Sequence, residues 1–259
     1  MYRQLFLKLL VCFSFNAFCI QAFSAEETFL LINGITNATV VELGPHINKQ
    51  ISPYSTFKIT LSLMGYDAGI LKTDKKPTWD YQEEYDDWIE EWKAPQTPQS
   101  WIKYSCVWYS KLLALKLGLD QVQSYLSSLE YGNQDLSGEF AKLGSSNPVW
   151  INSSLKISPK EQVEFIQKML KNKLPISNSA IQMTKMILFK EDLPGGWKLF
   201  GKTGTGNLDL EHGWFVGWIE KKHYFFPFAY LIRDHKINFN QRIPRVKQLL
   251  EKSNIMSED

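Results

Sequence analysis

The fold is decided by residues 197–206 (WKLFGKTGTG), 213–220 (GWFVGWIE) and 223–232 (HYFFPFAYLI). These segments are rich in aromatic and β-branched residues, which favour strands, and turn residues lie between them. The pattern predicts three antiparallel strands that follow one another in a meander. The C-terminal part of the chain is therefore expected to contribute these strands to an antiparallel sheet.

Two more strands are predicted near the N-terminus, at residues 28–33 (TFLLIN) and 38–43 (ATVVEL). Both are short and bounded by Asn-Gly or Gly-Pro, which favour turns. Strands at both ends with helices between them indicate an α+β fold class. We expect a mainly antiparallel sheet built from the N- and C-terminal segments, with helices packed on it and a helical region inserted at roughly residues 75–190.

The helical signals vary in strength along the chain. Ser158, Pro159 and Glu161 form a strong helix start, because they combine a capping hydroxyl, a proline in the first turn and a glutamate three residues after the cap. Residues 74–100 mix acidic residues, prolines and tryptophans, which is typical of a surface loop with aromatic anchors. Further helices are predicted from about Ser55, over residues 101–119, over residues 120–129 and over residues 241–252.

The composition is that of an ordinary globular protein. Of 259 residues, 44% are hydrophobic and 22% are charged, and the formal net charge is +2. The sequence contains no basic block, no Gly-rich phosphate loop and no zinc-type Cys/His spacing. We therefore expect no nucleic-acid partner, no metal site and no bound organic cofactor, in a monomer or homodimer.

Residues 1–25 have the pattern of a secretory signal peptide. Arg3 and Lys8 precede an apolar run that ends in small residues, and cleavage is expected after Ser24 or Ala25. Residues 26–259 would then form one domain that is secreted or periplasmic and does not associate with the membrane. An uncleaved membrane anchor is the alternative. Because the other two cysteines lie in the leader, Cys106 would be the only cysteine of the mature chain and could form no intramolecular disulfide.

Ser55 and Lys58 form a candidate catalytic pair. On a helix, residues three apart share a face, so the Ser55 hydroxyl and the Lys58 amine would lie within reach of each other. Pro53 suits the first helical turn, where free backbone N–H groups favour developing negative charge. The pair suits acyl transfer, although an exposed lysine on an amphipathic helix would give the same spacing.

Three further triplets follow in order along the chain: Ser105-Cys106-Val107 early in a helix, Tyr131-Gly132-Asn133 in a turn, and Lys202-Thr203-Gly204 at the end of a strand. Together with Ser55-Thr56-Phe57-Lys58 they resemble the motif set of the class D, or oxacillinase-type, serine β-lactamases. Residues 147–166 and 213–221 are similar to a loop with its following helix and to a strand of that family. The resemblance covers about residues 50–230.

The resemblance implies a role for each matching residue. Ser55 would be the acylated nucleophile of a β-lactam hydrolase that confers antibiotic resistance, and Lys58 the general base. In this family the lysine reacts with carbon dioxide to become N6-carboxylysine, so carbon dioxide or bicarbonate would be required. A free lysine has a pKa of about 10.4 and is a poor base at neutral pH, but burial disfavours its charged form. Phe57, Val107 and Trp150 are expected to surround Lys58. The Trp150 indole N–H would donate a hydrogen bond to the carboxylated lysine side chain.

The same resemblance places the substrate. Ser105 would pass a proton to the departing ring nitrogen, with Lys202 supplying positive charge beside it. The substrate carboxylate would be bound by Thr203 and Thr205, with Gly204 between them. Backbone N–H groups of Ser55 and Thr205 would form the oxyanion hole. Three arginines follow the last strand without a clean match to the family pattern, and of Arg233, Arg242 and Arg245 we choose Arg242 as the carboxylate-binding arginine.

Two other functions remain open from the sequence. The sensor domains of β-lactam receptors share the same motifs, so the protein could be a penicillin-binding sensor that is acylated without turnover. It could also be a secreted α+β binding module in which Ser55 and Lys58 have no chemical role. A transpeptidase is disfavoured because the chain is short and lacks an obvious second domain.

Overall fold

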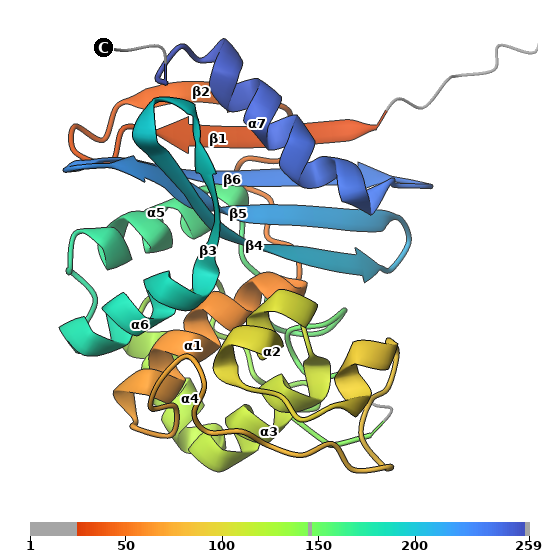
Figure 1. Ribbon diagram of the computed structural model, residues 1–259. Coiled ribbons are helices and arrows are strands. Elements are labelled where there is room, and N and C mark those ends of the chain that lie inside the picture. The colour runs from red at the N-terminus through yellow and green to blue at the C-terminus, as the bar shows by residue number, and fades with distance from the viewer. Residues whose placement is uncertain (1–24, 145–146, 257–259) are drawn as a thin grey trace, which may run out of the picture.

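The computed structural model describes residues 25–144 and 147–256. Its centre is a six-stranded antiparallel sheet with the strand order β2-β1-β6-β5-β4-β3 (Figure 1). The strands are β1 (Glu26–Ile32), β2 (Thr39–Leu43), β3 (Phe189–Leu193), β4 (Trp197–Asn207), β5 (Glu211–Lys221) and β6 (Tyr224–Asp234).

The helices connecting β2 to β3 form a separate layer against the sheet, and α7 crosses the opposite face (Figure 1). The α-helices are α1 (Lys58–Asp67), α2 (Pro98–Tyr104), α3 (Val107–Leu117), α4 (Leu119–Ser128), α5 (Pro159–Leu170), α6 (Asn178–Leu188) and α7 (Arg242–Lys252). Short 3₁₀ helices are η1 (Tyr54–Phe57), η2 (Glu90–Lys93), η3 (Pro194–Gly196) and η4 (Phe239–Gln241).

The expected α+β class is confirmed, and the sheet explains why both ends of the sequence carry strand patterns. β1 lies between β2 and β6 and pairs with β6 from Glu26↔Arg233 to Leu31↔Phe228. Helices cover both faces, so residues 212–219 of β5 are all buried. A strand covered on both faces reads as a continuous apolar run rather than an alternating one, which is the pattern of GWFVGWIE.

Two apolar cores flank the sheet. The smaller one packs Val246 and Leu250 of α7 against Phe215 and Phe228 of the meander. The larger one joins the other sheet face to the helical layer and includes Phe57, Trp101 and Trp150. The sequence motifs of interest belong to this larger core, at the boundary between sheet and helices.

The predicted start of α5 is confirmed. The Ser158 hydroxyl accepts a hydrogen bond from the Glu161 backbone N–H, and the Glu161 carboxylate accepts one from the Ser158 N–H at 2.7 Å. Neither α6 nor β3 was predicted, although Ser177 caps α6 by accepting from the Ala180 N–H.

The single helix predicted over residues 101–119 is wrong. α2 ends at Tyr104, and Ser105 adopts a left-handed conformation with φ 57°, which a right-handed helix cannot continue. α3 then starts at Val107, and the Trp101 indole N–H donates to Ser110 Oγ at 2.8 Å across the bend. Ser105, expected early in a helix, therefore lies in the turn between two helices.

The loop-rich segment expected over residues 74–100 is present up to residue 97, with Trp92 as a buried anchor, and residues 98–100 already belong to α2. The sequence did not predict the buried ion pair beneath this segment. Lys111 Nζ on α3 lies 2.9 Å from the Asp86 carboxylate and donates to the Gly144 carbonyl at 2.6 Å, and both charged side chains are fully buried. The pair attaches the loop to the helical layer.

None of the helices in residues 25–144 and 147–256 is long and apolar enough to cross a bilayer. The predicted leader falls almost entirely on residues outside the described ranges.

Replacing Asp86 with Asn should destabilise the protein by about 3 kcal/mol, because removing one member of a buried pair leaves the other charge without its counter-ion. Asp87→Asn is the matched control, since Asp87 is exposed, and should change the free energy of unfolding by less than about 0.5 kcal/mol. Urea unfolding of both variants gives the comparison. Equal stabilities would contradict the structural role given to Asp86.

Candidate active site

Ser55 and Lys58 are brought together by a change of helix type. Ser55 lies in η1 and Lys58 is the first residue of α1. Lys58 Nζ donates a hydrogen bond to Ser55 Oγ at 3.1 Å. The expected contact between hydroxyl and amine is therefore present in the structure.

Lys58 is not a surface lysine. Its side chain is 0% exposed, and burial lowers its pKa to about 7, against a smaller opposing effect of Cys106. Burial also raises the pKa of the Cys106 thiol to about 12, so the neighbour is a neutral thiol at physiological pH. Near pH 7 a large fraction of the Lys58 amines is uncharged and can act as a base or nucleophile.

Aromatic rings enclose this pair. The Phe57 ring lies 5.2 Å from the Trp150 ring and 5.5 Å from the Tyr131 ring, measured between centroids. Trp150 is 1% exposed, and its indole N–H has no hydrogen-bond acceptor among the described residues. Burying a hydrogen-bond donor without an acceptor costs free energy. The Trp150 indole N–H is therefore available to donate to a group that is not part of the polypeptide.

The loop that carries Trp150 is held in place from three directions. The Trp150 carbonyl accepts from the Tyr54 N–H at 2.9 Å, and Ile51 exchanges two backbone hydrogen bonds with Ile157. Asn133 donates to the Ser154 carbonyl at 2.8 Å. Asn133, in the turn expected at Tyr131-Gly132-Asn133, thus supports the loop through Ser154 and Lys156.

Glycines let η1 lie directly on β4. A Cβ on Gly204 would lie 3.0 Å from the Pro53 carbonyl oxygen and 3.4 Å from the Ser55 backbone nitrogen. One on Gly206 would overlap the Tyr54 ring, at 1.9 Å. The glycine of Lys202-Thr203-Gly204 thus allows the strand to approach Ser55 closely without crowding, and Gly206 is the position where a side chain would overlap η1.

Lys202 enters the same region from β4. It is 2% exposed, and its Nζ donates to the Thr203 carbonyl at 3.0 Å. Burial lowers the pKa of Lys202 well below its ordinary value, and Lys190, Lys58 and Arg242 lower it further, in that order. Lys202 and Lys58 therefore lie close enough for their charges to interact.

Of the three candidate arginines, only Arg242 reaches β4. Its Nη1 donates to Thr205 Oγ1 at 2.9 Å and to the Gly204 carbonyl at 2.5 Å, and burial lowers its pKa to about 10. Arg245 pairs with Glu27 at 2.6 Å. Arg242 thus stands beside the threonine expected to bind a carboxylate.

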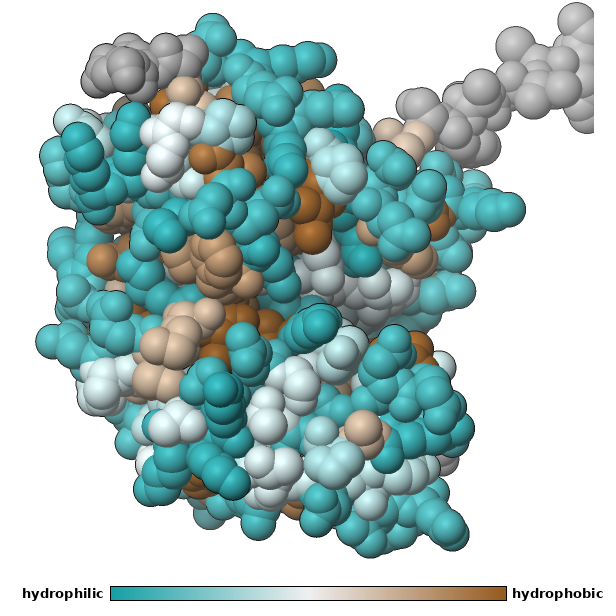
Figure 2. Space-filling view, viewed as in Figure 1, coloured by the Kyte–Doolittle hydropathy of each residue, from teal (hydrophilic) through white to brown (hydrophobic). Residues whose placement is uncertain are grey.

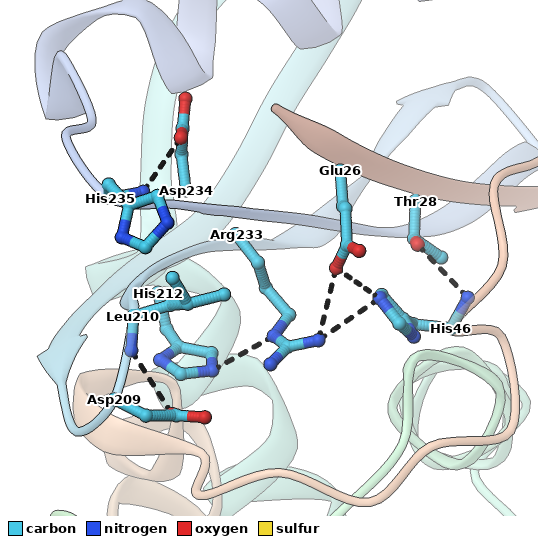
Figure 3. Close-up of polar contacts among 9 residues, drawn as sticks. All are labelled: Glu26, Thr28, His46, Asp209, Leu210, His212, Arg233, Asp234 and His235. Carbon is cyan, nitrogen blue, oxygen red and sulfur yellow. Dashed lines mark hydrogen bonds and ion pairs between the residues drawn. The ribbon is translucent and has the colours of Figure 1, made fainter. Parts of the chain in front are cut away.

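Arg233 belongs to a polar chain that runs across the sheet (Figure 3). Its Nη1 lies 3.1 Å from both Glu26 and His46, and its Nε donates to His212 Nε2 at 3.1 Å. His46 and Glu26 are 2.7 Å apart. These contacts connect β1, β5 and β6 to the segment that precedes η1 and occupy Arg233 away from Thr205.

Sequence reasoning missed two residues that support the site. Gln162 of α5 donates to Thr56 Oγ1 at 3.0 Å, and Thr56 donates in turn to the Pro53 carbonyl at 2.6 Å. Tyr54 adopts a positive φ of 50°, rare for a bulky residue. Gln162 follows the recognised Ser158 cap, but no pattern distinguishes it from other helical glutamines.

Comparison with known proteins shows which family shares this sequence and fold. The penicillin binding protein transpeptidase domain family matches residues 36–251. Beta-lactamase OXA-1 of Escherichia coli is 40% identical over 201 residues, 76% of this chain and 72% of that protein. The crystal structure of the OXA-427 class D beta-lactamase superposes with a TM-score of 0.78 at 34% identity, covering 88% of this chain and 99% of the other.

A relative of a different kind is the methicillin resistance mecR1 protein of Staphylococcus aureus. It is 36% identical over 209 residues, which are 79% of this chain but only 34% of the relative. With Ser55, Lys58 and Lys202 gathered at one site, these similarities show that the chain belongs to the penicillin binding protein transpeptidase domain family and, within it, to the class D β-lactamases. The resemblance read from the short motifs is confirmed, and the protein is an enzyme.

The burial of Lys58 predicts a pH-dependent stability difference from Lys58→Met in carbonate-free buffer. The lysine pKa is about 7 when folded and about 10.5 when unfolded, so the folded state binds fewer protons between these values. Wild-type stability should therefore rise, relative to the variant, as the pH increases from 7 to 10.5. At pH 7 and below the variant should be more stable by on the order of 4 kcal/mol.

Urea unfolding at pH 6, 7, 8, 9 and 10 measures this difference. Lys160→Met is the control, because Lys160 is exposed on α5, and its difference from wild type should not change with pH. A pH-independent difference for Lys58→Met would show that Lys58 is hydrated in solution.

Proposed function

We propose that the protein hydrolyses β-lactams through an acyl-enzyme on Ser55, with carboxylated Lys58 as general base. The observation that carries the proposal is the fully buried Lys58 amine 3.1 Å from the Ser55 hydroxyl. The OXA-1 and OXA-427 relatives, both named β-lactamases, support the reaction class.

Acylation begins with attack of Ser55 Oγ on the β-lactam carbonyl carbon while the base removes the hydroxyl proton. The carbonyl oxygen becomes an oxyanion, for which the backbone N–H groups of Ser55 and Thr205 are the proposed donors. One such donor is commonly worth about 3 kcal/mol. The C–N bond then breaks, and the ring nitrogen receives a proton through Ser105 with the charge of Lys202 beside it.

Carboxylation of Lys58 follows from its surroundings. An uncharged amine can form a bond to the carbon of carbon dioxide and lose a proton, whereas an ammonium group cannot. Once formed, the carbamate supplies an anionic oxygen base. The unpaired indole N–H of Trp150 is a donor suited to one of its oxygens, and the rings of Phe57 and Trp150 limit water. Carbon dioxide would be the only added requirement.

Substrate binding is assigned to the same strand. Thr203 and Thr205 would bind the substrate carboxylate, with Arg242 close enough to Thr205 to stabilise the negative charge. Gly204 leaves room for close approach, and the buried Val107 at the start of α3 would form part of the apolar wall. A carboxylate recognised by one guanidinium and two hydroxyls is consistent with a β-lactam, which carries this group next to the ring nitrogen.

A second candidate function is favoured by the similarity to the mecR1 protein. In that case Ser55 would be acylated but not released, because deacylation requires an active base after acylation. The two functions differ only in the fate of the acyl-enzyme. The unpaired Trp150 donor favours turnover, since it offers a partner for a carboxylated base.

We also propose export of the mature domain. The support is the leader pattern of residues 1–25, with basic residues before a short apolar run and small residues at its end. Antibiotic resistance follows if the exported enzyme destroys β-lactams before they reach their targets.

Substitution of the catalytic pair should separate acylation from release. Ser55→Ala should abolish labelling by a fluorescent penicillin, because no nucleophile remains. Lys58→Ala should be acylated slowly and then stay labelled, with deacylation slower by about 10²–10⁴-fold. Gel fluorescence over minutes to hours measures both. Lys160→Ala serves as control, and stable labelling of the wild-type protein with bicarbonate present would favour the sensor function instead.

Trp150→Phe should make hydrolysis depend more strongly on bicarbonate. A hydrogen bond to a charged group contributes about 1.5 kcal/mol. Losing it should raise the bicarbonate concentration that gives half of the maximal rate by about tenfold. Trp197→Phe is the matched control, because Trp197 also has a buried unpaired indole N–H but lies in the other core. Penicillin hydrolysis at increasing bicarbonate gives the comparison, and equal behaviour of the two variants would exclude the role given to Trp150.

A further inference from the structure

A cavity of about 540 Å³ lies between α2 on one side and α6 with the start of β3 on the other. We call it the α2–β3 groove. Tyr104, the residue before Ser105, lines it from α2, and Lys190 lines it from β3. Figure 2 shows apolar side chains gathered on this face, in the region where Figure 1 places α6, β3 and α2, with hydrophilic side chains around them.

Lys190 connects the groove to the catalytic strand. The pairing of β3 with β4 is regular at Phe189↔Phe200 and at Glu191↔Leu199 but shifts between them, so Lys190 has no cross-strand partner. Its charge acts on Lys202 more strongly than those of Lys58 or Arg242. The groove thus contains a lysine whose charge acts on Lys202 of the active site.

The groove is positively charged and has nothing in its lining to neutralise it. Its lining contains Lys103 and Lys190 but no aspartate or glutamate. Lys190 is half-buried and makes no hydrogen bond or ion pair with any described residue. The two acidic residues that follow it are already paired, Glu191 with Lys247 at 2.8 Å and Asp192 with Lys198 at 3.2 Å.

The rest of the lining combines the polar side chains of Thr97, Gln99 and Ser100 with apolar ones. Met186 is 56% exposed and Phe189 is 41% exposed, and Ile187 lies near the end of α6. A wall of this kind, with an unpaired ammonium group in it, fits a flat organic group that carries negative charge and hydrogen-bond acceptors. A cationic group would be repelled there.

The position of the groove indicates which part of the substrate would enter it. Under the proposed function, Ser105 faces the departing ring nitrogen, so Tyr104 and Lys190 lie beyond the nitrogen side of the scissile bond. In a cephalosporin, that side carries the six-membered ring and its C3 substituent, while the acyl side chain lies on the opposite side.

We propose that the α2–β3 groove binds the C3 substituent of cephalosporins and that Lys190 selects anionic substituents over cationic ones. This inference rests on the proposed function for the orientation of the substrate. Lys190 is a specificity-determining residue in this proposal and takes no part in the chemical steps.

Three cephalosporins with the same aminothiazolyl-methoxyimino acyl side chain provide the test: ceftriaxone with an acidic triazine at C3, cefotaxime with a neutral acetoxymethyl group, and cefepime with a pyrrolidinium cation. Second-order acylation rates come from competition with a fluorescent penicillin. The wild-type protein should be acylated faster by ceftriaxone than by cefepime, so the ratio of the two rates should exceed one. Lys190→Met should lower that ratio by about three- to tenfold, and Lys190→Arg should retain it.

Lys160→Met is the control for net charge, because Lys160 is exposed on α5 and outside the groove lining, and its ratio should stay within about twofold of wild type. Because Lys190 also acts on Lys202, its replacement could change the acylation rates of all three compounds by the same factor. The ratio of two rates removes this common factor. A ceftriaxone-to-cefepime ratio that is the same in Lys190→Met and wild type overturns the proposal.

A binding measurement separates this proposal from the proposed function. In the Ser55→Ala background no acylation occurs, and tryptophan fluorescence can report the Kd of ceftriaxone and cefepime at two salt concentrations. Tighter binding of ceftriaxone that weakens with salt and with Lys190→Met supports the groove even if the wild-type protein proves unable to hydrolyse β-lactams. Equal Kd values for the two compounds contradict it, whatever the fate of the acyl-enzyme.

Discussion

The active site depends on keeping one amine out of water. Lys58 is wholly buried at the start of α1, and no carboxylate in the part of the chain that the structure describes accompanies it to keep it charged. An ammonium group in such a place would cost several kcal/mol, so the protein lowers the pKa instead. The surrounding aromatic rings and the Cys106 thiol serve this end, since each is apolar or neutral. The low pKa of Lys58 is therefore a consequence of packing.

The need to place Ser55 beside the buried Lys58 also explains why β4 carries glycines where η1 packs against it. Ser55 must lie against a strand while Lys58 lies inside the helical layer, and only a residue without a side chain allows η1 to come so close to β4. Gly204 and Gly206 meet this requirement. Two arginines on the other elements have structural tasks, Arg233 in the polar chain of Figure 3 and Arg245 with Glu27, which leaves Arg242 at Thr205. The position of each of these arginines is thus fixed by its partners.

Local signals predicted the parts of the fold that are decided locally. The Ser158 capping box and the aromatic meander depend on near neighbours, and both were read correctly from the sequence. The break at Ser105 was missed because helical spacing continues through it, and only the packing of α2 across α3 forces the left-handed residue. α6 and β3 were missed too, and the buried Asp86–Lys111 pair unites residues whose individual patterns suggest surface positions. In the site, short motifs identified Ser55, Lys58 and Lys202, but the partners of Arg242 and Gln162 depend on tertiary contacts.

The strand β1 has a consequence for biosynthesis. It is among the first elements of the described chain to leave the ribosome, yet it is hydrogen-bonded to β6, which is made some two hundred residues later. Until β6 emerges, β1 and β2 are a small hairpin without a core, and the helical layer has no sheet to cover. The nascent polypeptide thus stays open throughout most of its synthesis and closes in a late, long-range step, a state in which chaperones can hold it.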